Sequence, residues 1–230
     1  MNPLPPGQKE SSLFPRFGLP QYANRFPTEL DQVRMTIGGD IEEFVVADDL
    51  ALLPRVEQVS DFHCVTTWSK LNLKWSGYSF SDFYNTLILP KVSDEINYVV
   101  LKAQDGYKTS LPLEDMMQPT VLLADHLDDE PLTVEHGAPI RLIAPDHYGY
   151  KNLKHIKRIG FYTERPQVKQ GYLSFMDHPR ARVAYEERVS TGPNLIFRYL
   201  YRFRIQSTIR EFDKAVAAYR ATSQTTDTNT

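Results

Sequence analysis

The chain has 230 residues, of which 41% are hydrophobic, and a formal net charge of −3. This length suits one large domain or two small ones with a packed core. Because positive and negative charges nearly balance, the average surface has no long-range attraction to nucleic acid or to an anionic membrane, and any basic function must be local. The longest apolar runs, such as 97–101, are far shorter than the roughly 20 residues of a membrane-spanning helix, so we expect no transmembrane segment.

The two ends of the chain differ in composition from its middle. The first twelve residues are rich in Pro, Gly, Ser and Lys without periodicity, which predicts a flexible leader at 1–12. The leader lacks the basic and apolar regions of a secretory signal and has no twin arginine, so we expect a cytoplasmic protein. Residues 221–230, mostly Thr, Ser, Gln, Asp and Asn, are predicted to form a disordered tail.

Between these ends, short elements of both kinds favour an α+β fold with a β-rich core. Helical pieces fit residues 48–53 and 81–89, with Ser81 as a cap of the second piece, and Gly38-Gly39-Asp40 is typical of a tight turn. Strands and long helices do not alternate regularly, which disfavours a doubly wound parallel sheet. Short β-branched or aromatic runs predict strands at 33–37, 44–47, 98–102 and 140–143.

The C-terminal quarter is predicted to form one long amphipathic helix within residues 191–220. Apolar residues from Phe197 to Tyr219 recur at helical spacing, and Asn194 is a suitable N-cap. The opposite face carries Arg198, Arg202, Arg204 and Arg210. We interpret this as an ordinary solvated face, with contact to a partner, a second copy or a membrane surface as the alternative.

The chain has one cysteine, Cys64, which excludes an internal disulfide and any multi-cysteine zinc or iron–sulfur site. Three roles remain open: a small buried hydrophobe, a nucleophile, or a single soft metal ligand. Its segment reads Phe62-His63-Cys64-Val65-Thr66-Thr67-Trp68-Ser69, followed by Lys74-Trp75-Ser76-Gly77. Both tryptophans of the chain therefore lie within eleven residues of the thiol.

Two further segments accompany the cysteine segment. One reads His136-Gly137-Ala138-Pro139-Ile140-Arg141, followed by Tyr148-Gly149-Tyr150-Lys151-Asn152-Leu153-Lys154, and a weaker one reads Leu13-Phe14-Pro15-Arg16-Phe17-Gly18. In this order, the segments resemble those of the sulfite oxidase and methionine-sulfoxide reductase superfamily of molybdopterin-dependent oxidoreductases. The resemblance covers roughly residues 13 to 165, and we expect the molybdopterin-binding domain at 13–190.

The resemblance implies a sulfite-oxidase-type fold, a molybdenum-molybdopterin cofactor, and oxygen-atom transfer at a sulfur or nitrogen centre. Cys64 would be the metal's thiolate ligand, since a high-valent metal prefers a soft anionic donor. The pterin phosphate requires cationic side chains and backbone N–H groups, which Arg141, Lys154 and the backbone of 152–154 could supply. The cofactor-binding residues that the resemblance implies are Phe14, Arg16, Cys64, Asp105, His136, Arg141, Asn152, Leu153 and Lys154.

Ordinary structural roles remain open for several of these residues. Asp105 equally fits the Asp-Gly corner of a hairpin, Arg141 a surface strand residue and His136 a turn residue.

The resemblance also bears on the substrate and on partners. Sulfite oxidation needs positive side chains at the metal, and Arg16 is the one catalytic candidate that aligns there. The chain shows neither the haem and dimerisation domains of eukaryotic sulfite oxidases nor an exported leader, which disfavours sulfite oxidation itself. We expect a small oxyanion or an S- or N-oxide as substrate. We also expect a separate electron-transfer partner, since the sequence shows no Gly-x-Gly-x-x-Gly fingerprint.

Two other hypotheses compete with this one. A hydrolase or transferase could use Cys64 as its nucleophile and His63 as its base, although neighbours on a strand point to opposite faces. Alternatively, the fold could serve as a non-catalytic binding or assembly module that uses its C-terminal helix as the contact surface.

Overall fold

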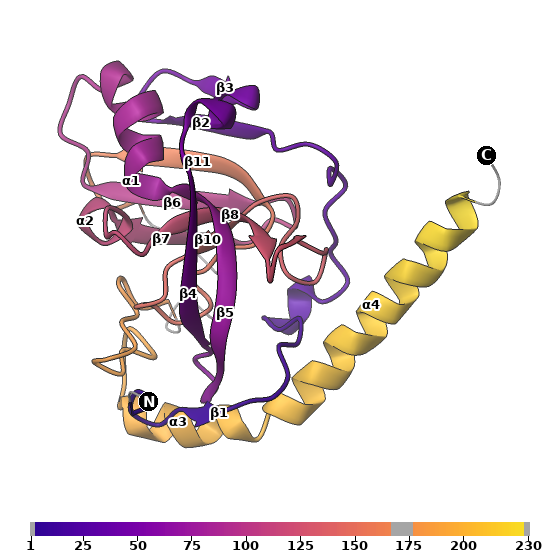
Figure 1. Ribbon diagram of the computed structural model, residues 1–230. Coiled ribbons are helices and arrows are strands. Elements are labelled where there is room, and N and C mark those ends of the chain that lie inside the picture. Colours follow the sequence, from indigo (N-terminus) through magenta and orange to yellow (C-terminus); the bar gives the residue numbers. More distant parts are fainter. Residues whose placement is uncertain (1–2, 167–176, 228–230) are drawn as a thin grey trace.

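The structure is a computed structural model that describes residues 3–166 and 177–227. It contains two β-sheets, several short helical segments and two helices at the C-terminal end (Figure 1). The mixed α+β fold class expected from the sequence is confirmed. The first sheet contains β1 (Lys9–Glu10), β4 (Arg55–His63), β5 (Trp68–Ser79), β8 (Leu122–Leu127), β9 (Glu130–Pro131) and β10 (Arg141–Ile143). The second contains β2 (Met35–Gly39), β3 (Phe44–Val46), β6 (Tyr98–Ala103), β7 (Lys108–Pro112) and β11 (Ile156–Tyr162).

The four strands predicted from β-branched runs are present, with shifted ends. They correspond to β2, β3, β6 and β10. The predicted tight turn is displaced, because Gly38 and Gly39 still belong to β2 and the chain reverses only after them. Gly39 has a φ of +107°, and a Cβ there would lie 2.2 Å from the carbonyl oxygen of Phe161 on β11. The two glycines therefore allow close pairing with β11 as well as the change of direction.

The long strand β5 organises the first sheet. It pairs with β4 along one side, and with β8 and the short β1 at different ends of the other side. Sequence patterning did not predict β4 or β5. Most of β4 is polar and at least partly exposed, so it lacks the continuous apolar run that marks a buried strand.

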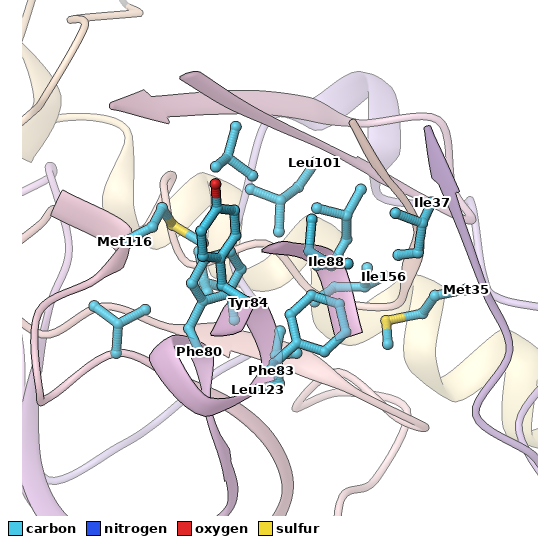
Figure 2. Close-up of a cluster of buried hydrophobic side chains, with 14 of the residues drawn as sticks. Met35, Ile37, Phe80, Phe83, Tyr84, Ile88, Leu101, Met116, Leu123 and Ile156 are labelled. Atoms are coloured by element: carbon cyan, nitrogen blue, oxygen red, sulfur yellow. The ribbon is translucent and has the colours of Figure 1, made fainter. Parts of the chain in front are cut away.

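The main core lies between the two sheets and takes side chains from both (Figure 2). Phe80, Phe83, Tyr84 and Ile88 fill it from α1 (Phe80–Phe83) and the π-helical turn Tyr84–Ile88. This segment agrees with the helical piece predicted at 81–89, but the capping residue is Ser79, whose hydroxyl accepts from the Asp82 amide (3.4 Å). The other short helices are α2 (Leu113–Met116) and the 3₁₀ turns Pro20–Tyr22, Asp48–Leu52 and Leu89–Lys91.

The C-terminal region forms two helices, α3 (Asn194–Arg202) and α4 (Ile205–Asp227), instead of the single helix predicted. The helix is interrupted at Phe203-Arg204, although neither residue is Pro or Gly. The second helix, α4, continues past the expected end at residue 220. The Asn194 side chain does not cap α3, because its oxygen accepts from the amides of Arg188 and Val189. Within the described residues, none of the helices has the length and apolar character needed to cross a membrane.

The predicted leader is tied to the domain. Lys9 and Glu10 form β1 on the edge of β5, and Gln8 is buried and donates to the carbonyl oxygen of Cys64 (3.1 Å). Composition alone suggested flexibility at 1–12. The structure shows instead that this segment packs beside the turn that carries the cysteine.

Candidate functional site

Cys64 occupies a tight turn between β4 and β5. Its amide donates to the Trp68 carbonyl oxygen (2.8 Å), and its own carbonyl accepts from the Thr67 amide (3.1 Å). The side chain is 6% exposed, and Sγ lies 3.1 Å from the hydroxyl of Thr66. Burial raises the pKa of the thiol, while the Thr66 hydrogen bonds and the positive charges of Arg188 and Lys154 oppose that rise. The turn therefore places a buried sulfur beside polar and cationic groups, unlike an inert thiol in an aliphatic core.

His63 does not act on this sulfur. Its ring nitrogen Nδ1 lies 2.7 Å from the Ser69 hydroxyl, which in turn donates to Gln8 (3.0 Å). Burial lowers the pKa of His63. This geometry disfavours a Cys64–His63 nucleophile and base, as the alternation of side chains on a strand predicted.

Arg141 is fully buried at the start of β10. Its guanidinium donates to the carbonyl oxygens of His136 (2.7 Å) and Asn152 (3.3 Å) and lies 5.0 Å from the centre of the Trp75 ring. Burial lowers its pKa to about 9. The alternative role as a surface strand residue is wrong, because the side chain has no exposed area.

Lys154 is a buried cation close to charged residues from several separate segments of the sequence. Its ammonium donates to the Glu135 carbonyl oxygen (2.6 Å). Burial lowers its pKa well below the usual value, and the charges of Arg141 and Arg16 lower it further, while Asp105 and Glu135 raise it. The cysteine segment and the segment from His136 to Lys154 meet in the fold, because the Gly149 amide donates to the His63 carbonyl oxygen (2.8 Å) and the Arg141 guanidinium lies 5.0 Å from the centre of the Trp75 ring.

His136 and Phe14 form the wall of a neighbouring cavity. Their rings stack with centres 4.8 Å apart and planes 6° apart. The Nδ1 atom of His136 is buried and has no hydrogen-bond partner among the described residues. Burial and the charges of Lys154 and Arg141 lower its pKa to about 4, so the ring is neutral at pH 7. The cavity, about 460 Å³ in volume, extends from these rings to α4.

The structure gives Arg16 partners that differ from those expected of a catalytic residue. Its guanidinium donates to the carbonyl oxygens of Ala23 (2.5 Å) and Arg25 (2.8 Å) and lies between the rings of Phe26 and Phe212. These contacts fix the segment before β2 against α4. A role of Arg16 at the metal therefore stays a prediction, and no described contact of its side chain supports it. Its positive charge does help to lower the pKa of Lys154.

Three other predicted residues serve the backbone. The Asn152 side chain accepts from the Ala144 amide (2.7 Å) and donates to the carbonyl oxygens of Ala144 and His147 (both 3.2 Å). The amides of Asn152 and Leu153 already donate to Gly149 and Lys151, so neither is a free donor for a phosphate. Asp105 caps the turn between β6 and β7 by accepting from the Tyr107 amide (2.8 Å), as the hairpin alternative proposed.

Sequence reasoning missed Arg188 and Thr66. Arg188 has no exposed area, and its guanidinium donates to the carbonyl oxygens of Val65, in the cysteine turn, and Pro6 (3.2 Å). It also pairs with Glu186 (3.0 Å). Arg188 lies more than a hundred residues from Cys64 and outside the motifs, so no local pattern indicates its position.

Comparison with known proteins gives one family for most of the chain. Residues 23–170 match the family described as the oxidoreductase molybdopterin binding domain. The match includes Cys64, Arg141 and Lys154, and it leaves out α3 and α4.

Several curated relatives were found. The uncharacterized oxidoreductase YuiH of Bacillus subtilis is 34% identical over 70% of this chain and 80% of its own length. A putative protein-methionine-sulfoxide reductase subunit, YedZ1 of Azospira oryzae, is 36% identical over 49% of this chain and 41% of that protein. The protein-methionine-sulfoxide reductase catalytic subunit MsrP of Campylobacter jejuni is 27% identical over 71% of this chain and 65% of that protein.

A solved structure shares the fold. The sulfane dehydrogenase SoxCD from Paracoccus pantotrophus superposes with a TM-score of 0.53 and 22% sequence identity. The superposition covers 65% of this chain and 43% of the SoxCD chain.

Proposed function

Because the chain belongs to the family of oxidoreductase molybdopterin-binding domains, of the sulfite-oxidase type, we propose that it catalyses oxygen-atom transfer at a sulfur or nitrogen centre, with Cys64 as the thiolate ligand of the metal. The observation that carries the proposal is that the segment of Arg141 and Lys154 contacts the cysteine segment directly, through the hydrogen bond from the Gly149 amide to the His63 carbonyl oxygen (2.8 Å) and the position of Arg141 5.0 Å from the Trp75 ring. These residues come from the two motifs on which the resemblance depends.

The donor groups of the described residues fit a molybdopterin cofactor. The Arg141 and Lys154 side chains donate only to backbone carbonyl oxygens in the described contacts, and no described carboxylate forms an ion pair with either. His136 has an unpartnered buried nitrogen. Cys64 offers one thiolate, and the described residues contain no group of three or more His, Cys, Asp or Glu side chains that could hold a metal ion by themselves. One protein thiolate suits a metal whose other ligands come largely from its cofactor.

The proposed roles follow from the charges of these residues. When bound, the cofactor supplies a metal that accepts or donates an electron pair as an oxygen atom moves. Arg141 and Lys154 would bind the phosphate of the pterin, and His136 would form a hydrogen bond to its ring system. The thiol of Cys64 must release its proton to bind a metal; burial raises the pKa of this thiol, and the charges of Arg188 and Lys154 oppose that rise in part.

The names of two relatives support a sulfur oxide within the proposed substrate class. They are named as subunits of protein-methionine-sulfoxide reductases, one of them putatively. The name of one relative as a catalytic subunit also supports a separate electron-transfer partner for this chain.

The experiment begins with protein purified from a host that makes the cofactor. Molybdenum is measured by elemental analysis, and released pterin by fluorescence after denaturation. Turnover is then followed with a reduced viologen dye as electron donor and methionine sulfoxide or trimethylamine N-oxide as acceptor. We expect molybdenum and pterin in equal amounts and dye oxidation with at least one acceptor. Protein that contains neither would identify the fold as a non-catalytic module.

Cys64→Ala tests the assignment of the ligand. We expect turnover to fall by more than roughly a hundredfold, the loss that mutation of outer-shell partners alone can cause. The fold should remain nearly intact, since a small side chain is removed. Val59→Ala, on the exposed side of β4, is the matched control and should keep full turnover. Retained turnover in Cys64→Ala would show that the metal does not depend on this thiolate.

A further inference from the structure

The outward side of α3 is a compact apolar surface. Leu195, Ile196, Tyr199, Leu200 and Phe203 are exposed by 58%, 57%, 57%, 53% and 84% respectively. Their spacing of one, three or four residues places them on one face of the helix and its C-terminal end. Such large apolar side chains usually occur singly on a surface, so a group of five indicates a surface that binds something.

The opposite side of α3 holds the helix to the domain. Arg198 pairs with Glu186, which also pairs with the buried Arg188. Arg202 donates to the Thr67 hydroxyl in the cysteine turn (3.4 Å). The hydroxyl of Tyr201 is buried as well. The helix is therefore attached through its polar side, and its apolar side cannot turn inward without breaking these contacts.

Positive charge borders the apolar surface. Along the helix, Arg202 falls at one edge of the apolar face and Arg204, which is exposed, follows beyond the other edge. No acidic residue occurs from Asn194 to Arg204. A helix with Leu, Ile, Phe and Tyr on one face and arginines at its borders has the composition of helices that lie in the headgroup region of a membrane.

We propose that α3 binds the surface of an anionic phospholipid membrane, with its apolar face among the lipid chains and the bordering Arg202 and Arg204 near the headgroups. A second copy of the chain fits this face less well, because arginines would meet arginines with no acidic residue on α3 to oppose them. The surface lies outside the family match at 23–170, and the proposal does not depend on the reaction catalysed at Cys64.

The contacts of α3 with the domain determine how the protein would be oriented on the membrane. The helix contacts the cysteine turn through Thr67 and, by way of Glu186 and Arg188, through Val65. A protein bound through α3 would therefore hold the Cys64 side of the molecule toward the membrane.

Sedimentation of the full chain with lipid vesicles tests the proposal. Vesicles of equal parts phosphatidylglycerol and phosphatidylcholine are compared with vesicles of phosphatidylcholine alone. We expect preferential binding to the anionic vesicles that weakens as salt increases. The double variant Leu200→Ser/Phe203→Ser should reduce the partition coefficient by roughly tenfold or more, because two large apolar side chains no longer enter the bilayer. Arg204→Gln should reduce it by roughly fivefold at low salt.

A matched control removes equally exposed apolar residues elsewhere. Leu52, at the end of the 3₁₀ turn Asp48–Leu52, and Val59, on β4, are exposed by 71% and 63%, so Leu52→Ser/Val59→Ser should bind vesicles as the unchanged chain does. Equal binding by both double variants would overturn the proposal, as would failure of the unchanged chain to bind anionic vesicles. A dimer in solution that only the α3 variant dissociates, without vesicle binding, would identify the surface as a protein interface. Molybdenum and pterin contents are measured on the same samples, so a failure of the proposed reaction is distinguished from a failure of membrane binding.

Discussion

Two groups of buried cations in this molecule differ in what neutralises them. Lys151 and Arg188, the paired cations, have no exposed area and contact carboxylates, Asp177 (2.7 Å) and Glu186 (3.0 Å). Arg141 and Lys154, the unpaired cations, contact backbone carbonyl oxygens and have no carboxylate within ion-pairing distance among the described residues.

The presence or absence of a paired carboxylate distinguishes cations with a structural role from cations that could bind an anionic ligand. A buried ion costs free energy unless an opposite charge accompanies it. The paired cations receive that charge from the chain itself. Burial lowers the pKa of both unpaired cations, so their charged forms are destabilised, and an anionic cofactor would neutralise them.

The largest expected effect on stability lies in the paired group. Lys151→Met leaves Asp177 nearly buried without its partner, and we expect the free energy of unfolding to fall by roughly 3–5 kcal/mol. Denaturant unfolding of cofactor-free protein at pH 7 measures it. The control is Lys157→Met, at an exposed position on β11, which should change stability by less than about 0.5 kcal/mol. Similar values for the two variants would contradict the distinction between the groups.

The next effect lies in the unpaired group and concerns binding. Arg141→Met should weaken retention of the cofactor by roughly a hundredfold, because a buried phosphate would lose a charged partner. The cofactor-free protein should lose less stability than Lys151→Met does, since no carboxylate is left unpaired. Pterin and molybdenum per protein after dialysis measure retention. Arg158→Met, which removes an exposed ion pair with Glu43, is the control and should retain the cofactor as the unchanged chain does. Unchanged retention in Arg141→Met would remove this residue from the site.

The sequence points to the unpaired cations more directly than to the paired ones. Arg141, Lys154 and Cys64 lie in segments whose local pattern resembles a known family, so the sequence alone predicts them as site residues. Arg188 approaches the cysteine turn only because the chain returns to it after the family region, and local patterns do not report such long-range contacts. Asp105 and Asn152 were assigned to the site, but their side chains mainly hydrogen-bond to the backbone of nearby turns.

The same limit applies to the fold. Strands with continuous β-branched runs, such as β6, were predicted because their apolar residues enter the core. The polar strand β4 was missed, since its pairing with β5 and not its own composition determines its structure. The break between α3 and α4 was missed because periodicity continues across it, while the contacts of α3 with Glu186 and Thr67 are invisible in the sequence.

A third prediction concerns the pH dependence of stability that comes from His155, a buried histidine close to the unpaired cations. His155 is buried, and its Nδ1 donates to the Ala138 carbonyl oxygen (2.6 Å). Burial, together with the charges of Lys154, Arg16 and Arg141, lowers its pKa to about 3 from an unfolded value near 6.5. The unfolded chain therefore binds this proton first as the pH falls, and stability present above pH 6.5 is lost on acidification. Between about pH 6.5 and pH 5 the loss from this one group should reach about 2 kcal/mol.

His155→Gln isolates this contribution, because an amide can still donate to Ala138 but does not titrate. We expect the fall in unfolding free energy between about pH 6.5 and pH 5 to be smaller in the variant by up to about 2 kcal/mol. Identical pH profiles would mean that folding does not change the pKa of His155. His126→Gln is a suitable control, since that ring is partly exposed and outside the group.

The smallest expected effect comes from Arg198, which shares the carboxylate of Glu186 with the buried Arg188. Glu186 accepts from both Arg188 (3.0 Å) and Arg198 (Nε, 2.6 Å). Arg198→Gln should cost under about 1 kcal/mol, because Glu186 keeps Arg188 and the lost ion pair is partly exposed. Glu186→Gln should cost several times more, since it makes the fully buried Arg188 an unpaired cation that no cofactor is placed to neutralise. Denaturant unfolding of both variants compares the two costs. Equal costs would show that Arg188 depends on the carbonyl oxygens of Val65 and Pro6 more than on its carboxylate, and that burial beside the cysteine turn does not by itself require an opposite charge.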